Sequence, residues 1–447
     1  MEGNPKIEAL RYIWLKIAFP AEGRRGWKGV AMMISNINTS SSSVSYLELA
    51  SRRSRFINAL KQSFLALSLD LGGLLAGSIL LLSSNMFSVA PWFIMIYPSI
   101  ISMRGVIGGF FSGRLSTALH LGTIRPSLLN NTRDFKILVF SVIILTVLSS
   151  ITTGLLAFLI NISLWRTSII DSLSIFSAII TTMGLSLIFV SPVTIGISII
   201  SFKHGLDPDI IVYPVMSTIG DILTTLCFVF SMNLLINPVG PLLTGIFDLA
   251  YILIAAFLVV RHRGSRELSR TIREFLLTLI IVTLIVNLTG GLLRGISGLI
   301  KGRSEIYVLY PALMDMIGDI GSIIGSITTT RLALGTIDSS LRSIQESLPE
   351  MGGALLSSTI WFMLFSPLAI YLAYGGIILD DLFTLMLMLM SLNILAAPAI
   401  STLSYSLAVF TFQRGLDPDN FVIPCESTLS DSITTASLLI VITLFTW

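Results

Sequence analysis

Long apolar runs are the feature of this sequence that most restricts its fold. They recur along most of the chain, at or above the roughly 20 residues that an α-helix needs to span a bilayer. Inside a bilayer a helix satisfies all of its backbone hydrogen bonds internally. The runs are continuous rather than alternating, which disfavours a transmembrane β-barrel. The sequence therefore predicts an all-α polytopic membrane protein.

The charge content of the chain agrees with this class. Charged residues make up 12% of its 447 residues, about half of the quarter that is typical of soluble domains. The net charge is +3 without a dense basic tract, so nucleic acid is not an expected partner. Cys227 and Cys425 lie in apolar runs, where we expect them to pack as side chains rather than form a disulfide.

Eleven transmembrane helices are predicted, preceded by a cytosolic extension at residues 1–56. The extension is more polar than the rest of the chain and lacks the pattern of a cleaved signal peptide. The predicted spans lie near 57–83, 89–115, 136–164, 173–201, 209–232, 240–260, 272–298, 305–333, 353–376, 382–409 and 420–445.

Two pairs of segments show that the chain contains an internal repeat. Residues 202–225 and 412–435 are identical at 13 of 24 positions, and both contain GLDPD. Residues 97–124 and 310–337 both begin with Tyr-Pro and end in LxLGTI. The offsets between the pairs, 210 and 213, are nearly equal. A repeated unit of five helices accounts for both.

The first helices of the two units carry a weaker match, LGGLLAG at 71–77 against TGGLLRG at 289–295. The predicted organisation has four segments: the extension at 1–56, repeat 1 at 57–235, a linking transmembrane helix and loop at 236–270, and repeat 2 at 271–447.

The linking helix determines how the two repeats are oriented. Five spans reverse the direction of the chain and the linking helix reverses it again, so the repeats are expected to run parallel, related by an axis along the membrane normal. Most Lys and Arg residues then fall on one side, which predicts a cytoplasmic N-terminus and a C-terminus outside. Four basic residues fall on the opposite side: Arg166, Arg294, Lys301 and Arg303.

Asp221 and Asp431 occupy the same position in the fifth helix of each repeat. An aspartate at the centre of a membrane helix costs about 2.5–3.5 kcal/mol to insert, and such residues usually face the bundle interior or a water-filled path. We therefore interpret this pair as functional. Hydroxyl residues share the same helix face as each aspartate. Either they line the path or they hydrogen-bond neighbouring helices; they include Ser217, Thr218, Ser427 and Thr428.

Repeat 2 has further acidic residues in predicted spans. Asp315 and Asp319 lie one turn apart in its second helix, where repeat 1 has Ser102 and Val106. In the alternative reading, one of the two is protonated, or Arg294 or Arg331 neutralises it. Glu426 is either a ligand at the mouth of the path or part of a buried ion pair.

Other acids have simpler interpretations. Asp70 and Asp248 are acids in predicted spans without a repeat partner, and Asp248 is interpreted as structural. Asp207 and Asp417, each followed by proline, are expected to cap the fifth helices.

The candidate site contains only oxygen donors, which suit hard cations such as Mg²⁺. The three histidines, His120, His204 and His262, are near predicted membrane edges and do not cluster. This disfavours a transporter of soft metals.

These motifs together resemble the membrane domain of the MgtE family. The fifth helices of both repeats carry G-x-D-P, followed by P-x6-D with Ser-Thr ahead of the aspartate. The second helices of both repeats contain a proline. In repeat 1 it is followed by a G-x-I-G element at Gly105 and by R-L-S-T, and in repeat 2 by Gly318-Asp319. The two-repeat arrangement is similar to the duplicated solute-carrier branch of these magnesium transporters. The resemblance extends over about 57–447.

The resemblance implies a pathway for Mg²⁺, or for Mn²⁺ or Co²⁺, between the repeats, within one chain acting as a monomeric pseudo-dimer. The ion is the transported substrate, and no resident cofactor or enzymatic activity is implied. The family's Gly-Asn pair becomes Gly105-Val106 and Gly318-Asp319, so the two repeats differ here. Its cytosolic sensing domains do not fit into residues 1–56, so we do not expect gating by them.

The candidate ion-binding residues are Asp221, Asp431, Asp315, Asp319, Ser217, Ser427, Thr218, Thr428 and Glu426. A proton- or sodium-coupled carrier for another substrate could use the same acids. An intramembrane aspartyl protease is disfavoured, because Met316-Ile317-Gly318-Asp319 lacks the first glycine of G-x-G-D.

Overall fold

The computed structural model describes most of the chain outside its N-terminal part. The described residues are 41–90, 92–127, 130–204, 208–297, 303–377, 379–414 and 418–445. The predicted capping residues Asp207 and Asp417 lie outside them. The chain divides into two units, Met1–Ser54 and Arg55–Trp447. Only the start of one helix is described in the first unit, and all of the contacts discussed below are within the second.

The described residues form helices and turns without strands, which confirms the predicted all-α class. In chain order the elements are α3 (Ser41–Ala66), the 3₁₀ helix η2 (Leu67–Asp70), α4 (Leu71–Leu82), α5 (Asn85–Val89), α6 (Trp92–His120), α7 (Arg133–Ser163), α8 (Ile169–Lys203), α9 (Pro208–Ile236), α10 (Gly240–Arg261), α11 (Arg266–Ser297), α12 (Ser304–Ala333), the 3₁₀ helix η3 (Leu341–Glu346), α13 (Leu348–Tyr374), α14 (Leu379–Gln413) and α15 (Pro418–Phe445).

Within the described residues, ten helices are long and apolar enough to cross a membrane. They correspond to ten of the predicted spans. The other, predicted at 272–298, is part of α11, whose described apolar part, Leu279–Arg294, is shorter than a full span. The chain is thus a multi-pass membrane protein.

The first span is not one continuous helix, which the sequence did not predict. It consists of the end of α3, then η2, then α4, and Asp70 is the last residue of η2. At this break the hydroxyl of Thr218 on α9 donates a hydrogen bond of 3.1 Å to the carbonyl of Leu69. A side chain of the fifth helix therefore satisfies a backbone group at the break.

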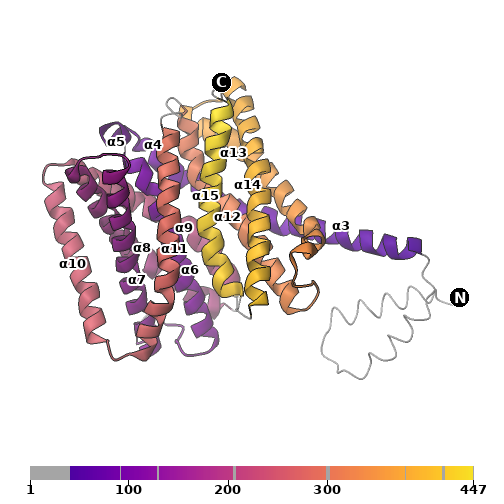
Figure 1. Cartoon of the computed structure of the whole chain (residues 1–447), viewed down its shortest axis with the longest axis horizontal. Helices are drawn as coiled ribbons and strands as arrows, with labels where there is room; N and C mark the ends of the chain where they lie inside the picture. The colour runs from indigo at the N-terminus through magenta and orange to yellow at the C-terminus, as the bar shows by residue number, and fades with distance from the viewer. Residues whose placement is uncertain are drawn as a thin grey trace. The chain divides into compact units, whose positions relative to one another are not determined.

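The first helix of each repeat packs against the second helix of the other repeat. The helix α4 of repeat 1 contacts α12 and α13, and α11 of repeat 2 contacts α6 and α7. Each also contacts the fifth helix of its own repeat, α9 for α4 and α15 for α11. Figure 1 shows α11 beside α15 in the bundle. The two repeats therefore exchange their first helices.

Glycines allow this exchange by bringing backbones close together. A Cβ atom added at Gly77 would lie 2.0 Å from the carbonyl oxygen of Val308, and one at Gly290 would lie 2.2 Å from that of Met95. Both pairs are related by an offset of 213. The match of 71–77 to 289–295, an offset of 218, is therefore wrong by five residues.

The LxLGTI motif marks the end of the second helix in both repeats. Gly122 has a φ of 68° and Gly335 a φ of 65°, a left-handed conformation that glycine adopts without the strain of a side chain. The repeated glycine thus closes α6 and α12 in the same way.

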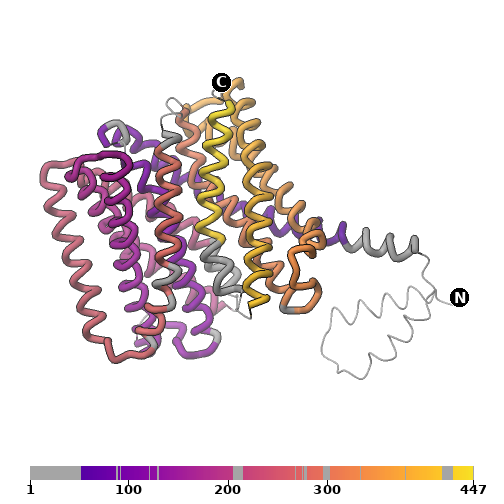
Figure 2. The backbone as a smooth tube through the Cα atoms, in the orientation of Figure 1, coloured from indigo at the N-terminus to yellow at the C-terminus, as the bar shows by residue number. Residues whose placement is uncertain are grey.

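The linking helix α10 contacts α7, α8 and α9, all in repeat 1. Figure 2 shows the chain descending through α10 at one edge of the bundle and then continuing into α11. Large apolar side chains of α10 such as Leu242, Ile246 and Leu253 are exposed, as expected for a face that contacts lipid.

Candidate functional site

The fifth-helix aspartates lie inside the bundle. Asp221 on α9 is 6% exposed and Asp431 on α15 is 7% exposed. The two carboxyl groups are close enough to interact electrostatically. The prediction that they face the interior is confirmed.

Each of these aspartates contacts the other repeat. The hydroxyl of Ser102 on α6 donates to the carboxylate of Asp431 on α15. The carboxyl group of Asp221 on α9 is close enough to that of Asp315 on α12 to interact with it electrostatically. Ser102 and Asp315 are equivalent positions, at an offset of 213. The same contact between the repeats thus occurs twice, with a hydroxyl group on one side and a carboxyl group on the other.

A second pair of hydrogen bonds joins the second and fifth helices within each repeat. The phenol of Tyr97 is 2.9 Å from the hydroxyl of Thr225, and the phenol of Tyr310 is 2.8 Å from that of Thr435. These contacts position α9 on α6 and α15 on α12. Each threonine is four residues beyond an aspartate, so the tyrosines also orient the carboxylate face of the helix.

The hydroxyl residues of the candidate set have different roles. Ser217 is a close neighbour of the Asp315 carboxyl group, so it belongs to the site. Thr218 donates to the backbone at η2, so its hydroxyl joins helices as in the structural alternative. Ser427 is partly exposed and Thr428 is buried, both on α15.

Glu426 is fully buried beside other acids. Its carboxylate accepts a hydrogen bond of 2.8 Å from the hydroxyl of Ser322, and it interacts electrostatically with Asp319 and Asp431. Among the described residues no ion pair includes Glu426. The described contacts therefore give no support to the ion-pair interpretation of Glu426.

The arginines proposed to neutralise Asp315 or Asp319 have other partners. Arg331 forms ion pairs with Glu346, at 3.7 Å, and with Glu350, at 3.4 Å. Arg294 donates to Asn161 at 3.2 Å and lies over the ring of Trp165. These contacts do not support neutralisation of the α12 aspartates by either arginine.

Arg104 belongs to the site although the sequence analysis did not single it out. It is buried in the middle of α6, and its Nε donates to the hydroxyl of Ser186 at 3.0 Å. Ser186 is in turn 2.9 Å from the hydroxyl of Thr224. Arg104 interacts electrostatically with Asp221. The sequence signal that could have identified it is a lone arginine in an apolar span, because placing an arginine at the centre of a membrane helix costs as much free energy as placing an aspartate there.

Asp70 is also part of the site, whereas Asp248 is not. Asp70 is 3% exposed and its electrostatic neighbours are Asp319, Asp315 and Asp221. Asp248 on α10 accepts hydrogen bonds from Ser177 at 2.5 Å and from Thr181 at 2.7 Å on α8. Its carboxylate is satisfied by these hydroxyls, in agreement with the structural role predicted for it.

Four carboxylates of the site have a buried oxygen without a hydrogen-bond partner in the described part of the chain. They are Oδ2 of Asp70, Oδ2 of Asp221, Oδ2 of Asp315 and Oε1 of Glu426. Such oxygens are costly to bury unless a cation or water satisfies them. No group of three acidic, histidine or cysteine side chains among the described residues could hold a metal ion. The unpartnered carboxylate oxygens suit a cation that uses one or two carboxylates and retains water, as Mg²⁺ does.

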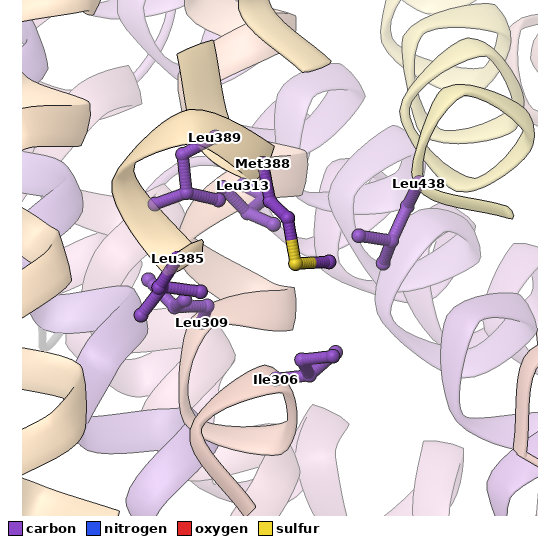
Figure 3. Close-up of a pocket in the computed structure, with 7 residues that line it drawn as sticks. All are labelled: Ile306, Leu309, Leu313, Leu385, Met388, Leu389 and Leu438. Atoms are coloured by element: carbon purple, nitrogen blue, oxygen red, sulfur yellow. The ribbon is translucent and has the colours of Figure 1, made fainter. Parts of the chain in front are cut away.

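An apolar pocket lies elsewhere in repeat 2, between α12, α14 and α15. Figure 3 shows the side chains that line it: Ile306, Leu309, Leu313, Leu385, Met388, Leu389 and Leu438. None of them carries a charge, so this pocket is not part of the acidic site.

The chain is similar to known proteins in two comparisons. The family model MgtE, described as a divalent cation transporter, matches residues 97–231 and again residues 310–441. Solute carrier family 41 member 2 of Xenopus laevis is 22% identical over 369 residues, which cover 77% of this chain. The match covers 64% of that relative, less than two thirds of its length. No solved structure matches the chain.

Proposed function

Since the chain belongs to the MgtE family of divalent cation transporters, we propose that it transports Mg²⁺ along a carboxylate-lined pathway between its two repeats. The observation that carries this proposal is the doubled contact between repeats, Ser102 with Asp431 and Asp315 with Asp221. These contacts bring the two fifth-helix carboxylates, one from each repeat, to a common region inside the membrane.

The chemistry of this region favours Mg²⁺ over softer metals. The donors are carboxylate and hydroxyl oxygens, which hard cations prefer. Carboxylates buried without partners repel one another, and a divalent ion between them offsets that repulsion. Mg²⁺ keeps several of its waters when it binds one or two carboxylates, so the fifth-helix pair is a sufficient protein ligand set for it.

One chain supplies both carboxylates, so we expect a monomer to contain a complete pathway. The N-terminus would then be cytoplasmic and the C-terminus outside, with the repeats parallel. A purified monomer that is inactive while a crosslinked dimer transports Mg²⁺ would contradict this part of the proposal.

A second candidate is a carrier that couples transport to protons or sodium. The proximity of the Asp221 and Asp315 carboxyl groups favours it, because acids that lie together inside a membrane often form proton relays. The two candidates differ in whether a gradient of protons or sodium changes the flux.

The test is Mg²⁺ flux into proteoliposomes, measured with and without a proton or sodium gradient. Asp221→Asn and Asp431→Asn keep the shape of the side chain and remove its charge, so each should reduce flux strongly. The matched control is Asp248→Asn, a buried membrane acid that Ser177 and Thr181 satisfy outside the site, and it should retain flux. Normal flux in both fifth-helix variants would refute the assignment. Flux that requires a gradient would favour the coupled carrier.

A further inference from the structure

The break in the first span of repeat 1 distinguishes it from the first helix of repeat 2. Repeat 1 interrupts the span at η2 and ends the interruption with a buried acid, Asp70. In repeat 2, α11 runs without interruption from Arg266 to Ser297. A buried acid within a membrane helix is costly, so it requires a compensating interaction.

The contacts of α4 with α12 determine what Asp70 faces. Gly73 lies against Ala312, and Gly77 lies against Val308, so the two helices run antiparallel at this contact. Asp70 precedes Gly73 by three residues and Asp315 follows Ala312 by three, so these two acids are level with one another in the antiparallel pair. The hydrogen bond from Thr218 to Leu69 places α9 beside the same turn. Asp70 therefore lies among acids from α9 and α12, in agreement with its electrostatic neighbours.

The equivalent place in the other repeat has no acids from the first and second helices. Gly290 lies against Met95 there, and the Ser99 hydroxyl donates to the carbonyl of Val286 at 2.9 Å. The positions that match Asp70 and Asp315 at an offset of 213 are Thr283 and Ser102. Hydroxyl groups thus replace carboxyl groups, and the hydroxyl of Thr283 lies 3.5 Å from those of Thr152 and Thr153.

We infer that Asp70 and Asp315 form a second cation site between α4 and α9 of repeat 1 and α12 of repeat 2, separate from the position between Asp221 and Asp431. The inference rests on the proposed function, because it assigns this site to the same cation pathway. The ligand is a divalent cation that keeps part of its water shell.

An unsatisfied atom supports a ligand at this place independently of the acidic character of the cluster. Asp70 is 3% exposed, and its Oδ2 is buried without a hydrogen-bond partner in the described part of the chain. Asp315 also has an unpartnered Oδ2. Two carboxylates of adjacent helices thus present free oxygens where no protein donor reaches them. A cation and its waters would satisfy both.

With this site, the pathway would contain two cation-binding sites that differ in their acidic ligands. Asp315 is shared, because it interacts electrostatically with Asp221 and is level with Asp70. An ion at the central position and an ion beside Asp70 would then repel one another through a common ligand. Ions that bind at adjacent sites and repel one another leave more readily, which favours conduction.

The experiment counts Mn²⁺ ions bound to the purified full chain by equilibrium dialysis, with Mn²⁺ as the probe. The wild-type chain should bind two ions. Asp70→Asn should lose one ion and keep the other, Asp431→Asn should keep the ion beside Asp70, and Asp70→Glu should restore the count. The matched control Asp248→Asn should bind two ions.

An unchanged count and affinity in Asp70→Asn would overturn the second site. If Asp70→Asn does not fold, Asp70→Thr replaces it, since it introduces the residue of the equivalent position Thr283 and the inference predicts that it loses the same ion. Mg²⁺ flux in wild-type proteoliposomes separates this result from the proposed function. Flux with an unchanged Mn²⁺ count in the variant refutes only the second site, whereas absence of both flux and Mn²⁺ binding in the wild-type chain refutes the function itself.

Discussion

The contact of Gly290 with the α6 backbone gives a direct test of the exchange of first helices, on which the position of Asp70 depends. A Cβ atom at Gly290 would lie 2.2 Å from the carbonyl oxygen of Met95, whereas one at the adjacent Gly291 would meet nothing within 4 Å. Gly290→Ala and Gly291→Ala therefore form a matched pair. Replacing glycine by alanine in a helix gains about 0.5–1 kcal/mol in both variants.

The difference between the two variants isolates the steric overlap. Overpacking of a tight contact costs about 1–3 kcal/mol, and the upper part of this range applies here because the obstructing atom belongs to the backbone and cannot rotate away. Gly291→Ala should be slightly more stable than the wild-type chain, and Gly290→Ala less stable than Gly291→Ala by about 2–3 kcal/mol. The assay is the free energy of unfolding from a denaturant titration in mixed micelles. Equal stability of both variants would refute the packing of α11 on α6.

Three further predictions concern the contacts of the site and the topology. Tyr97→Phe and Tyr310→Phe each remove one hydrogen bond of the same geometry. Both should lower the free energy of unfolding by about 0.6 kcal/mol, the average for such bonds in a membrane protein. A lower free energy of unfolding in only one variant would contradict the equivalence of the two contacts. Arg104→Gln removes a positive charge near Asp221 that repels a bound cation. If this repulsion is worth about 1 kcal/mol, its loss should lower the apparent Kd for Mn²⁺ roughly fivefold, whereas Arg104→Lys should bind as the wild-type chain does. Weaker binding in Arg104→Gln would show that the arginine supports the site instead. A reporter fused after Trp447 should be accessible from outside the cell, and access from the cytosol alone would exclude the parallel arrangement.

The sequence was sufficient to predict features that follow from one helix at a time. The apolar runs predicted the spans. The matching positions of Asp221 and Asp431 within the two repeats predicted that both aspartates face the interior. Both predictions depend on local periodicity and on the cost of a charge in lipid. They agree with α9 and α15 as the structure has them.

Features that depend on how helices pair could not be read from the sequence. Asp70 had no repeat partner, and only the packing of α4 on α12 brings it to Asp315. The sequence match of the first helices aligned Gly77 with Gly295, because glycine and leucine recur within each of these short segments. The close backbone approaches in the structure show that Gly77 is equivalent to Gly290 instead. Arg104 was visible as a lone charge, but its proximity to Asp221 depends on the contact of α6 with α9.

The position of a bound divalent ion tests the central claim most directly. Mn²⁺ scatters X-rays anomalously and can replace Mg²⁺ at oxygen sites, so an anomalous difference map from crystals grown with Mn²⁺ locates the ion without reference to any variant. The account predicts a peak between the α9 and α15 helices, next to the carboxylates of Asp221 and Asp431, that disappears in Asp431→Asn crystals. A map with no peak at these carboxylates, or with a peak that persists unchanged in that variant, would contradict the proposal that the two repeats hold the ion between them.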